Sequence, residues 1–214
     1  MFSKKPDPNE IIVTTPLLKM FVADNPKKNG PIVGRLFQGY RTAWQKEKPP
    51  ITDAYAKIDE LRARDGAANK QITCRKGCSF CCAQRVGVTQ PEAELLANEI
   101  KSGRVKVDKK RIAMQARWPD NPGEWSKRTF EHSRCTFLND NNECIVYDVR
   151  PMSCRALVAV GPPRACGINV DNRKTKVQSY GVNIEIETLV AAVWTENKDT
   201  MGNLPRLLTE ELKK

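Results

Sequence analysis

The chain has 214 residues, of which 36 are Lys or Arg and 25 are Asp or Glu, so its formal net charge is +11. A chain of this length can bury the core of one domain, which excludes the dependence on disulfides seen in very small secreted modules. The excess of positive charge suits an acidic partner, nucleic acid above all.

The first 50 residues are rich in Pro, Lys and Asn and contain only short apolar pieces. We expect an extended N-terminal arm over residues 1–50, followed by one domain over residues 51–214. The lysines at the start are not followed by the apolar stretch of a signal peptide. The apolar segment over residues 11–22 is interrupted by Pro16 and Lys19 and is too short to span a bilayer. We therefore expect a cytoplasmic protein without a membrane segment.

Helices are expected on both sides of the cysteine-rich middle of the chain. Residues 52–66 carry apolar side chains at helical spacing, and Gly66 ends the pattern. A short alternating strand over residues 85–89 leads into Thr89-x-x-Glu92, a capping box that opens a helix. Further helices are expected over residues 108–117, 183–197 and 204–212.

Between these helices, the sequence predicts a hairpin and a short helix. Residues 135–147 surround the turn-forming run Asn-Asp-Asn-Asn, which is typical of a β-hairpin. Asp148 can then cap a short helix over residues 149–157, which carries Cys154.

Seven of the eight cysteines lie in two groups, four within nine residues and three in the predicted hairpin and short helix. They are Cys74, Cys78, Cys81 and Cys82, then Cys135, Cys144 and Cys154. Thiols at this density either form disulfides or hold metal, and in a reducing compartment metal binding or redox chemistry is the expected use. In a helix or a tight knuckle, the first group would project its sulfur atoms from one side.

The donor set suits a soft metal. Four thiolates complete a tetrahedral zinc site or hold an iron–sulfur cluster, so either cofactor fits. Adjacent Cys81 and Cys82 diverge, which leaves open which of them binds, and the roles of Cys166 and His132 stay open too. The expected fold is α+β and mostly α: a small metal-organised domain with one short β-hairpin and an extended N-terminal arm.

Basic residues have two expected uses. Arginines beside the cysteines would offset the negative charge of a multi-thiolate site. Arg150 and Arg155 either hydrogen-bond metal-bound sulfur or serve only for capping and salt bridges. The densest cationic run lies over residues 101–111 and lacks aromatic residues for base stacking. It is either a solvated helix end or a phosphate-binding patch, with candidate nucleic-acid contacts at Lys106, Lys109, Lys110 and Arg111.

The full pattern resembles a known family. Its elements are C-x3-C-x2-C-C, V-x-V-T-x-x-E, C-x-F-L, C-x-V-Y and R-P-x-x-C-R, found here at Cys74–Cys82, Val86–Glu92, Cys135–Leu138, Cys144–Tyr147 and Arg150–Arg155. They are similar to the CxxCxxCC (YkgJ-like) cysteine-cluster family, described as zinc- or iron-chelating. The resemblance implies metal chelation by the seven cysteines named above, and it implies a reaction much less.

Three functional hypotheses are open at this point. The first is a metal-binding protein that holds zinc or an iron–sulfur cluster in a mainly structural site. The second is an iron–sulfur-dependent modifying enzyme, methyltransferase-like, as in the larger relative flagellin lysine methylase; whether this chain is an enzyme stays open. The third is a basic adaptor that contacts nucleic acid or a protein partner through the N-terminal arm and the basic surface.

Overall fold

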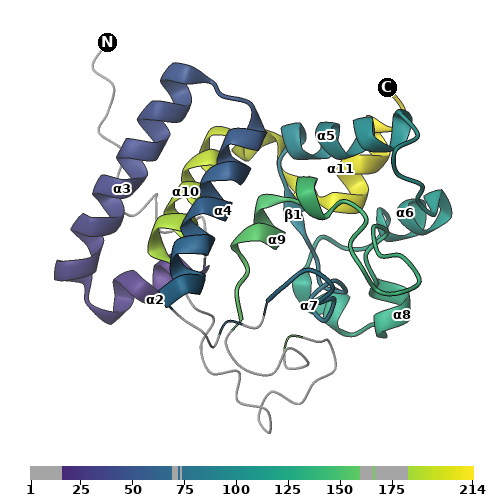
Figure 1. Cartoon of the computed structure of the whole chain (residues 1–214), viewed down its shortest axis with the longest axis horizontal. Helices are drawn as coiled ribbons and strands as arrows, with labels where there is room; N and C mark the ends of the chain where they lie inside the picture. Colours follow the sequence, from purple (N-terminus) through teal and green to yellow (C-terminus); the bar gives the residue numbers. More distant parts are fainter. Residues whose placement is uncertain (1–15, 69–71, 73, 160–165, 167–182) are drawn as a thin grey trace, which may run out of the picture.

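The computed structural model describes residues 16–68, 72, 74–159, 166 and 183–214. This part of the chain is mostly helical, as expected (Figure 1). The longer helices are α2 (Pro16–Asp24), α3 (Pro26–Glu47), α4 (Ile51–Ala68), α5 (Gln90–Lys101), α10 (Ile184–Glu196) and α11 (Leu204–Glu211). The shorter ones are α6 (Lys109–Gln115), α7 (Pro122–Ser126), α8 (Phe130–Ser133), α9 (Met152–Ala156) and the 3-10 turns η1 (Tyr147–Val149) and η3 (Lys198–Thr200). None of the described helices is long and apolar enough to cross a membrane.

One set of helices gathers α2, α3 and α4 around α10, on the left in Figure 1. On α3, Val33 and Phe37 are four residues apart, which places both on one face, and each is 1% exposed. They pack in a cluster with Ala191 and Ala192 of α10. The small side chains on α10 let the two helices approach closely, so the first helical layer is fixed by burial.

Residues 16–47 differ from the extended arm that we expected, because they form α2 and α3. The prolines that suggested an arm are compatible with helix at the start of α3. Pro26 occupies the first turn, where its missing N–H would have no partner, and the side chain of Asn25 caps the helix through the backbone N–H of Lys28. Burial of Val33 and Phe37 then stabilises the helix beyond Pro31.

A second set of helices, α5, α6 and α11, forms the other end of the molecule around a separate apolar cluster. Its fully buried members include Leu96, Phe137 and Leu208. The capping box at Thr89 and Glu92 is confirmed at the start of α5, and Asp108 caps α6 as the N-cap residue. The helices predicted over residues 52–66, 108–117, 183–197 and 204–212 are thus confirmed as α4, α6, α10 and α11.

Within the described residues, the antiparallel strand pair lies elsewhere than the hairpin we expected. Strand β1 (Gly87–Val88) pairs with β2 (Gly202–Asn203), with Val88 opposite Gly202. Residues 135–147 keep only an isolated bridge between Leu138 and Cys144. The side chain of Asn139 accepts hydrogen bonds from two backbone N–H groups of the turn, which closes a loop in place of a regular ladder.

The short helix α9 joins the two sets, because it packs against α4, α10 and β1 (Figure 1). It begins at Met152 with Pro151 as N-cap, so the expected cap at Asp148 is wrong. A residue before proline is disfavoured in the α region, and Arg150 accordingly has an extended backbone with ψ of 146°. Asp148 lies instead in the 3-10 turn η1.

Candidate metal centre

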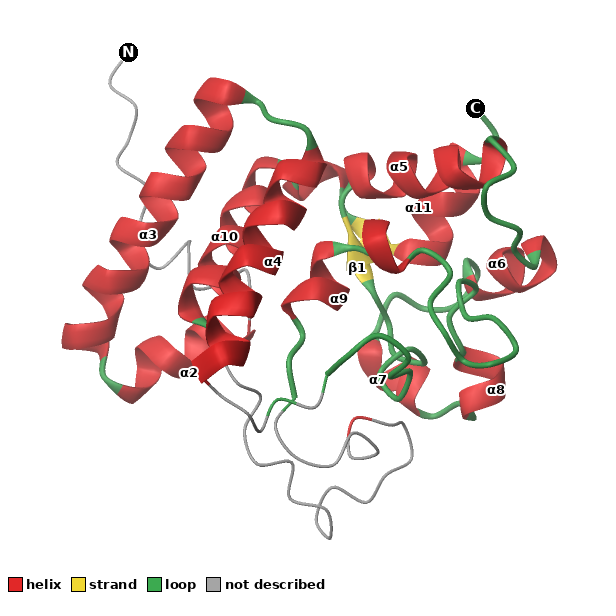
Figure 2. Ribbon diagram, viewed as in Figure 1, coloured by secondary structure: helices red, strands yellow, loops and turns green. Residues whose placement is uncertain are grey.

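A single cavity of about 140 Å³ gathers all seven cysteines of the two sequence groups. They are Cys74, Cys78, Cys81, Cys82, Cys135, Cys144 and Cys154. One water molecule needs only about 10–15 Å³ on this measure, so the cavity is larger than a packing defect. Most of the cysteine-bearing segments, residues 74–86 and 134–146, are loops and turns, drawn green in Figure 2. Cysteines far apart in sequence therefore line one space.

The first group is held by a series of tight turns. The backbone N–H of Cys78 bonds the carbonyl oxygen of Arg75 at 3.1 Å, and that of Cys82 bonds Ser79 at 2.9 Å. Gly77 has φ of +89°, a left-handed conformation that side chains rarely adopt. Gly77 thus allows the chain to reverse between Cys74 and Cys78.

The thiol of Cys74 receives a hydrogen bond of its own. The backbone N–H of Ala159, just beyond α9, donates to Cys74 Sγ at 3.1 Å. Donors to sulfur of this kind are a usual feature of metal-bound cysteine. The contact also ties the start of the first group to the chain that follows Cys154.

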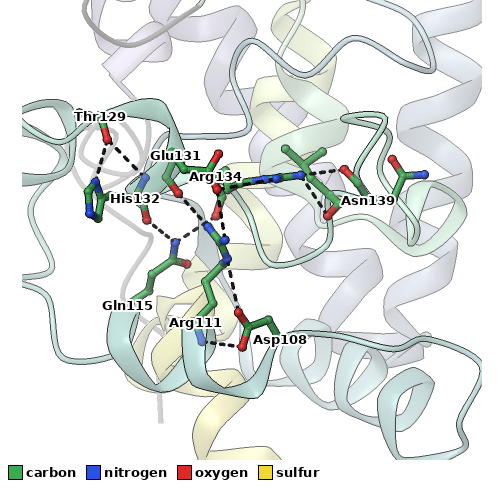
Figure 3. A network of polar contacts seen from close by, with 9 residues as sticks. Asp108, Arg111, Gln115, Thr129, Glu131, His132, Arg134 and Asn139 are labelled. Atoms are coloured by element: carbon green, nitrogen blue, oxygen red, sulfur yellow. Dashed lines mark hydrogen bonds and ion pairs between the residues drawn. The ribbon is translucent and has the colours of Figure 1, made fainter.

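A polar network positions the segment that precedes Cys135 (Figure 3). The side-chain amide of Gln115, on α6 and 1% exposed, donates at 3.0 Å to the carbonyl oxygens of His132 and Arg134. The guanidinium of Arg134 in turn donates to the carbonyl oxygen of Asn139 at 2.7 Å. The loop that carries Cys135 is therefore held from both ends by buried or half-buried side chains.

Arg155 and Arg150, on either side of Cys154, both pair with Asp59 but differ in their other contacts. The side chain of Arg155 is 2% exposed, bonds the carbonyl oxygens of Arg150 and Asp148, and pairs with the carboxylate of Asp59. Arg155 does not line the cavity, whereas Arg150 does. The guanidinium of Arg150 lies 3.8 Å from the ring centre of Tyr147. Arg155 thus holds the backbone around Cys154, and Arg150 supplies charge to the cavity.

The cavity wall is cationic and apolar. Its charged residues are Arg62, Arg75, Arg85 and Arg150, and the described residues that line it include no Asp or Glu. Positive side chains at the wall favour thiolate over thiol and offset the negative charge that several thiolates retain after a metal binds. The apolar remainder includes Val86, Phe137 and Leu157.

Burial sets most of the thiols against ionisation in the metal-free protein. It raises the pKa of Cys135 to about 12 and raises the pKa of Cys154 well above its usual value. The hydrogen bond from the Cys82 thiol instead lowers the pKa of Cys81 to about 7. At neutral pH, Cys81 is thus closer to being a thiolate than Cys135 or Cys154 before metal arrives.

Sequence reasoning left Cys166 unplaced, and the structure puts it beside the first group. Cys166 is buried, and the side chain of Gln84 donates to its carbonyl oxygen at 2.9 Å. Burial, followed by the charges of Cys74, Cys81 and Cys78, raises the pKa of Cys166 to about 11. Its spacing along the chain matches no motif element, so only the folded arrangement could reveal this position.

His132 and the cationic run, whose roles the sequence did not decide, do not line the cavity. His132 is exposed, and its Nδ1 is 2.8 Å from the hydroxyl oxygen of Thr129. In the cationic run, Lys106, Lys109 and Lys110 are exposed. Arg111 bonds the backbone oxygen of Glu131 at 2.8 Å and so serves the network of Figure 3. A nucleic-acid contact through this run stays a prediction.

The donor chemistry of the cavity fits zinc or iron. No three His, Cys, Asp or Glu side chains in the described part of the chain are arranged to hold an ion as they stand. The thiols line the wall, so binding would draw them inward. Thiol donors without carboxylates are the set that zinc and iron–sulfur clusters take, and hard cations such as Mg²⁺ or Ca²⁺ prefer oxygen.

A mostly helical domain whose loops direct clustered cysteines into one cavity has the architecture of a cysteine-based metal-binding domain. The sequence model of the CxxCxxCC family, described as a putative zinc- or iron-chelating domain, matches residues 73–181, just over half of the chain. The chain belongs to this family. No curated protein matches it, and no solved structure does.

Proposed function

We propose that this protein holds zinc or an iron–sulfur cluster in the cysteine cavity and that the metal serves mainly to organise the fold. The observation that carries the proposal is the gathering of Cys74, Cys78, Cys81, Cys82, Cys135, Cys144 and Cys154 around one cavity. Cysteines that only fill the core are not expected to converge from separate loops on a cavity lined by four arginines.

A structural role follows from where these cysteines lie. Their segments are mainly loops and turns, whereas α2, α3 and α10 share an apolar cluster that contains no residue of these segments. Metal–thiolate bonds would join the loop of residues 74–82 to the loop of residues 134–146 and to α9. Because such a site does not exist in the unfolded chain, the free energy of binding adds to the free energy of folding.

The same cavity suits either metal in its electrostatics. Zinc with four thiolates carries a net charge of −2, and iron–sulfur clusters held by four thiolates are negative as well. Arg150, Arg62, Arg75 and Arg85 at the wall would offset that charge. When bound, the metal supplies strong directional bonds to sulfur, and the protein supplies the apolar and cationic surroundings.

The test is metal content and absorbance of protein purified without oxygen. Stoichiometric zinc without colour would identify a zinc site, and iron with acid-labile sulfide and a visible band bleached by dithionite would identify a cluster. Replacing Cys135 by Ser should lower the metal content, whereas His132→Gln, outside the cavity, should leave it unchanged. A metal-free, colourless wild-type protein that is fully folded would contradict the proposal.

A further inference from the structure

The side chain of Glu92 is 0% exposed. The capping box that the sequence predicts uses only one of its two carboxylate oxygens. Oε2 accepts hydrogen bonds from the backbone N–H of Thr89 at 2.8 Å and from the Thr89 hydroxyl at 3.0 Å. These contacts complete the capping box of α5. The other oxygen points away from the cap.

Oε1 of Glu92 bonds two other helices. It accepts from the backbone N–H of Met152, the first residue of α9, at 2.7 Å, and from the Tyr55 hydroxyl of α4 at 3.4 Å. One buried carboxylate therefore joins α4, α5 and α9. Burying a charge without partners is costly, and the four donors offset that cost. The carboxylate can therefore stabilise the junction of the three helices.

The contact matters because α9 carries Cys154 and has only five residues. A helix this short is not stable alone, so contacts from outside set its position. At its start, Met152 is held by Glu92. Next to Cys154, the hydroxyl of Ser153 donates to the carbonyl oxygen of Gly87 at 2.5 Å.

Tyr55 connects the two sides of Cys154. Its hydroxyl bonds Glu92, which holds Met152, and its ring lies 4.4 Å from the guanidinium carbon of Arg155. Met152, two positions before Cys154, and Arg155, one position after it, are thus held by the connected side chains of Glu92 and Tyr55. A change at Glu92 should move the backbone that aims the Cys154 thiol.

We propose that Glu92 is a positioning residue for metal binding: through the N–H of Met152 it fixes α9 so that Cys154 Sγ faces the metal cavity. This inference rests on the proposed function, because it takes Cys154 as a metal ligand. It goes beyond the role of Glu92 as a helix cap, which concerns only the other oxygen.

The test uses cadmium as the probe metal, read by its nuclear magnetic resonance shift and by chelator competition. The shift of ¹¹³Cd reports the number and geometry of its thiolate ligands. Glu92→Gln keeps the size of the side chain but faces either Thr89 or Met152 with an amide N–H. We expect it to weaken cadmium binding by about 10–100-fold and to move the shift in the same direction as Cys154→Ser.

Two companion variants separate positioning from stability. Val33→Ala, in the separate apolar cluster of α3 and α10, should lower the free energy of unfolding without moving the cadmium shift. Tyr55→Phe removes one donor to Oε1 and should move the shift less than Glu92→Gln does. Tyr55→Phe also provides the decisive reading if Glu92→Gln cannot be recovered folded.

The outcomes separate failure of the proposed function from failure of the positioning role of Glu92. If the wild-type protein holds no iron–sulfur cluster and binds no cadmium through thiolates, the proposed function fails. If it does bind, but Cys154→Ser leaves the shift unchanged, or the Glu92 and Tyr55 variants match the wild type in affinity and shift, the positioning role of Glu92 is overturned. Weaker binding with a moved shift in Glu92→Gln, and an unmoved shift in Val33→Ala, supports it.

Discussion

The backbone N–H of Cys135 donates a 2.6 Å hydrogen bond to the carbonyl oxygen of Cys82, which joins the two cysteine groups through the main chain. Both residues also line the cavity. The relative position of the groups is therefore set partly by protein hydrogen bonds before any metal binds. A metal would complete this junction and hold the remaining cysteine-bearing turns.

Removing the metal should loosen the cysteine loops first and leave the helices around α10 folded. The loops have turn hydrogen bonds and, under the proposed function, bonds from thiolate to metal, while α3 and α10 bury Val33, Phe37 and their neighbours in a separate cluster. After chelation, we expect amide hydrogen exchange to accelerate over residues 74–82 and 134–156 and to stay slow in α3 and α10. Mass-spectrometric exchange with and without chelator measures this.

The control is re-addition of the metal under anaerobic conditions, which should restore protection in the same loops. Equal acceleration in α3 and α10 would show that metal holds the whole chain together. Unchanged exchange in the loops would show that the turn hydrogen bonds suffice and would remove the structural role.

Gln115→Met should destabilise the segment that carries Cys135. The substitution preserves size but leaves the carbonyl oxygens of His132 and Arg134 without the donor seen in Figure 3. Loss of a donor to partly buried acceptors costs about 1–3 kcal/mol, so the free energy of unfolding should fall by about that amount. Urea unfolding followed by circular dichroism measures the change. Gln45→Met, on the exposed side of α3, is the matched control and should be near neutral.

Metal content gives a second reading for the same variant. If Gln115 acts only on stability, the metal content at low temperature should equal that of the wild type. If it also holds Cys135 at the cavity, metal affinity should fall as well. An unfolding free energy equal to that of the wild type would contradict the role assigned to the Gln115 amide.

Local rules predicted much of the helical part of the fold. The capping box at Thr89 and Glu92 and the N-cap at Asp108 depend on contacts within three residues, and both occur as expected. The same rules failed over residues 16–47. There the prolines and lysines suggested an extended arm, and the helical spacing of Val33 and Phe37 was given too little weight. Burial against α10 decides that segment, and no local pattern contains it.

For the candidate site too, the sequence pattern predicted one part, and contacts between distant residues decided the rest. The motif spacing singled out the seven cysteines, and the fold gathers them at one cavity. The contact of Glu92 with Met152 and the place of Cys166 near Cys74 span long stretches of chain, so spacing could not predict them. Arg155 was expected either to hydrogen-bond metal-bound sulfur or to make capping and salt-bridge contacts, and its guanidinium contacts backbone oxygens and Asp59.

Gly77→Ala should destabilise the knuckle of the first cysteine group. A Cβ at this position would meet nothing within 4 Å, so the cost is conformational and comes from φ of +89°. It should amount to about 1–2 kcal/mol in the free energy of unfolding of the metal-bound protein. Thermal unfolding measures it.

Gly39→Ala provides a matched control for Gly77→Ala. Gly39 lies inside α3, where an added Cβ also meets nothing within 4 Å. Alanine there should stabilise the helix by about 0.5–1 kcal/mol. Opposite signs for the two substitutions are the expected result, and a stabilising Gly77→Ala would show that the left-handed turn is absent in solution.

The final prediction concerns pH. Burial raises the pKa of Cys135 to about 12, and the pKa of Cys154 is raised well above its usual value, so both thiols are protonated at neutral pH without metal. Metal binding must displace these protons, and affinity should therefore fall as pH is lowered, by about tenfold per pH unit for each proton released. Chelator competition at pH 6, 7 and 8 measures the slope, and calorimetry in buffers of different ionisation enthalpy counts the protons.

The metal-free protein should show the opposite sign. A thiol whose pKa is raised on folding adds stability below its unfolded pKa of 9.0 and loses that contribution as pH rises through the folded value of about 12. The metal-free protein should thus weaken between pH 9 and 12, where bound thiolates carry no proton to lose. Cys135→Ala should release one proton fewer on binding and flatten the slope. Affinity independent of pH would show that the buried thiols are not ligands.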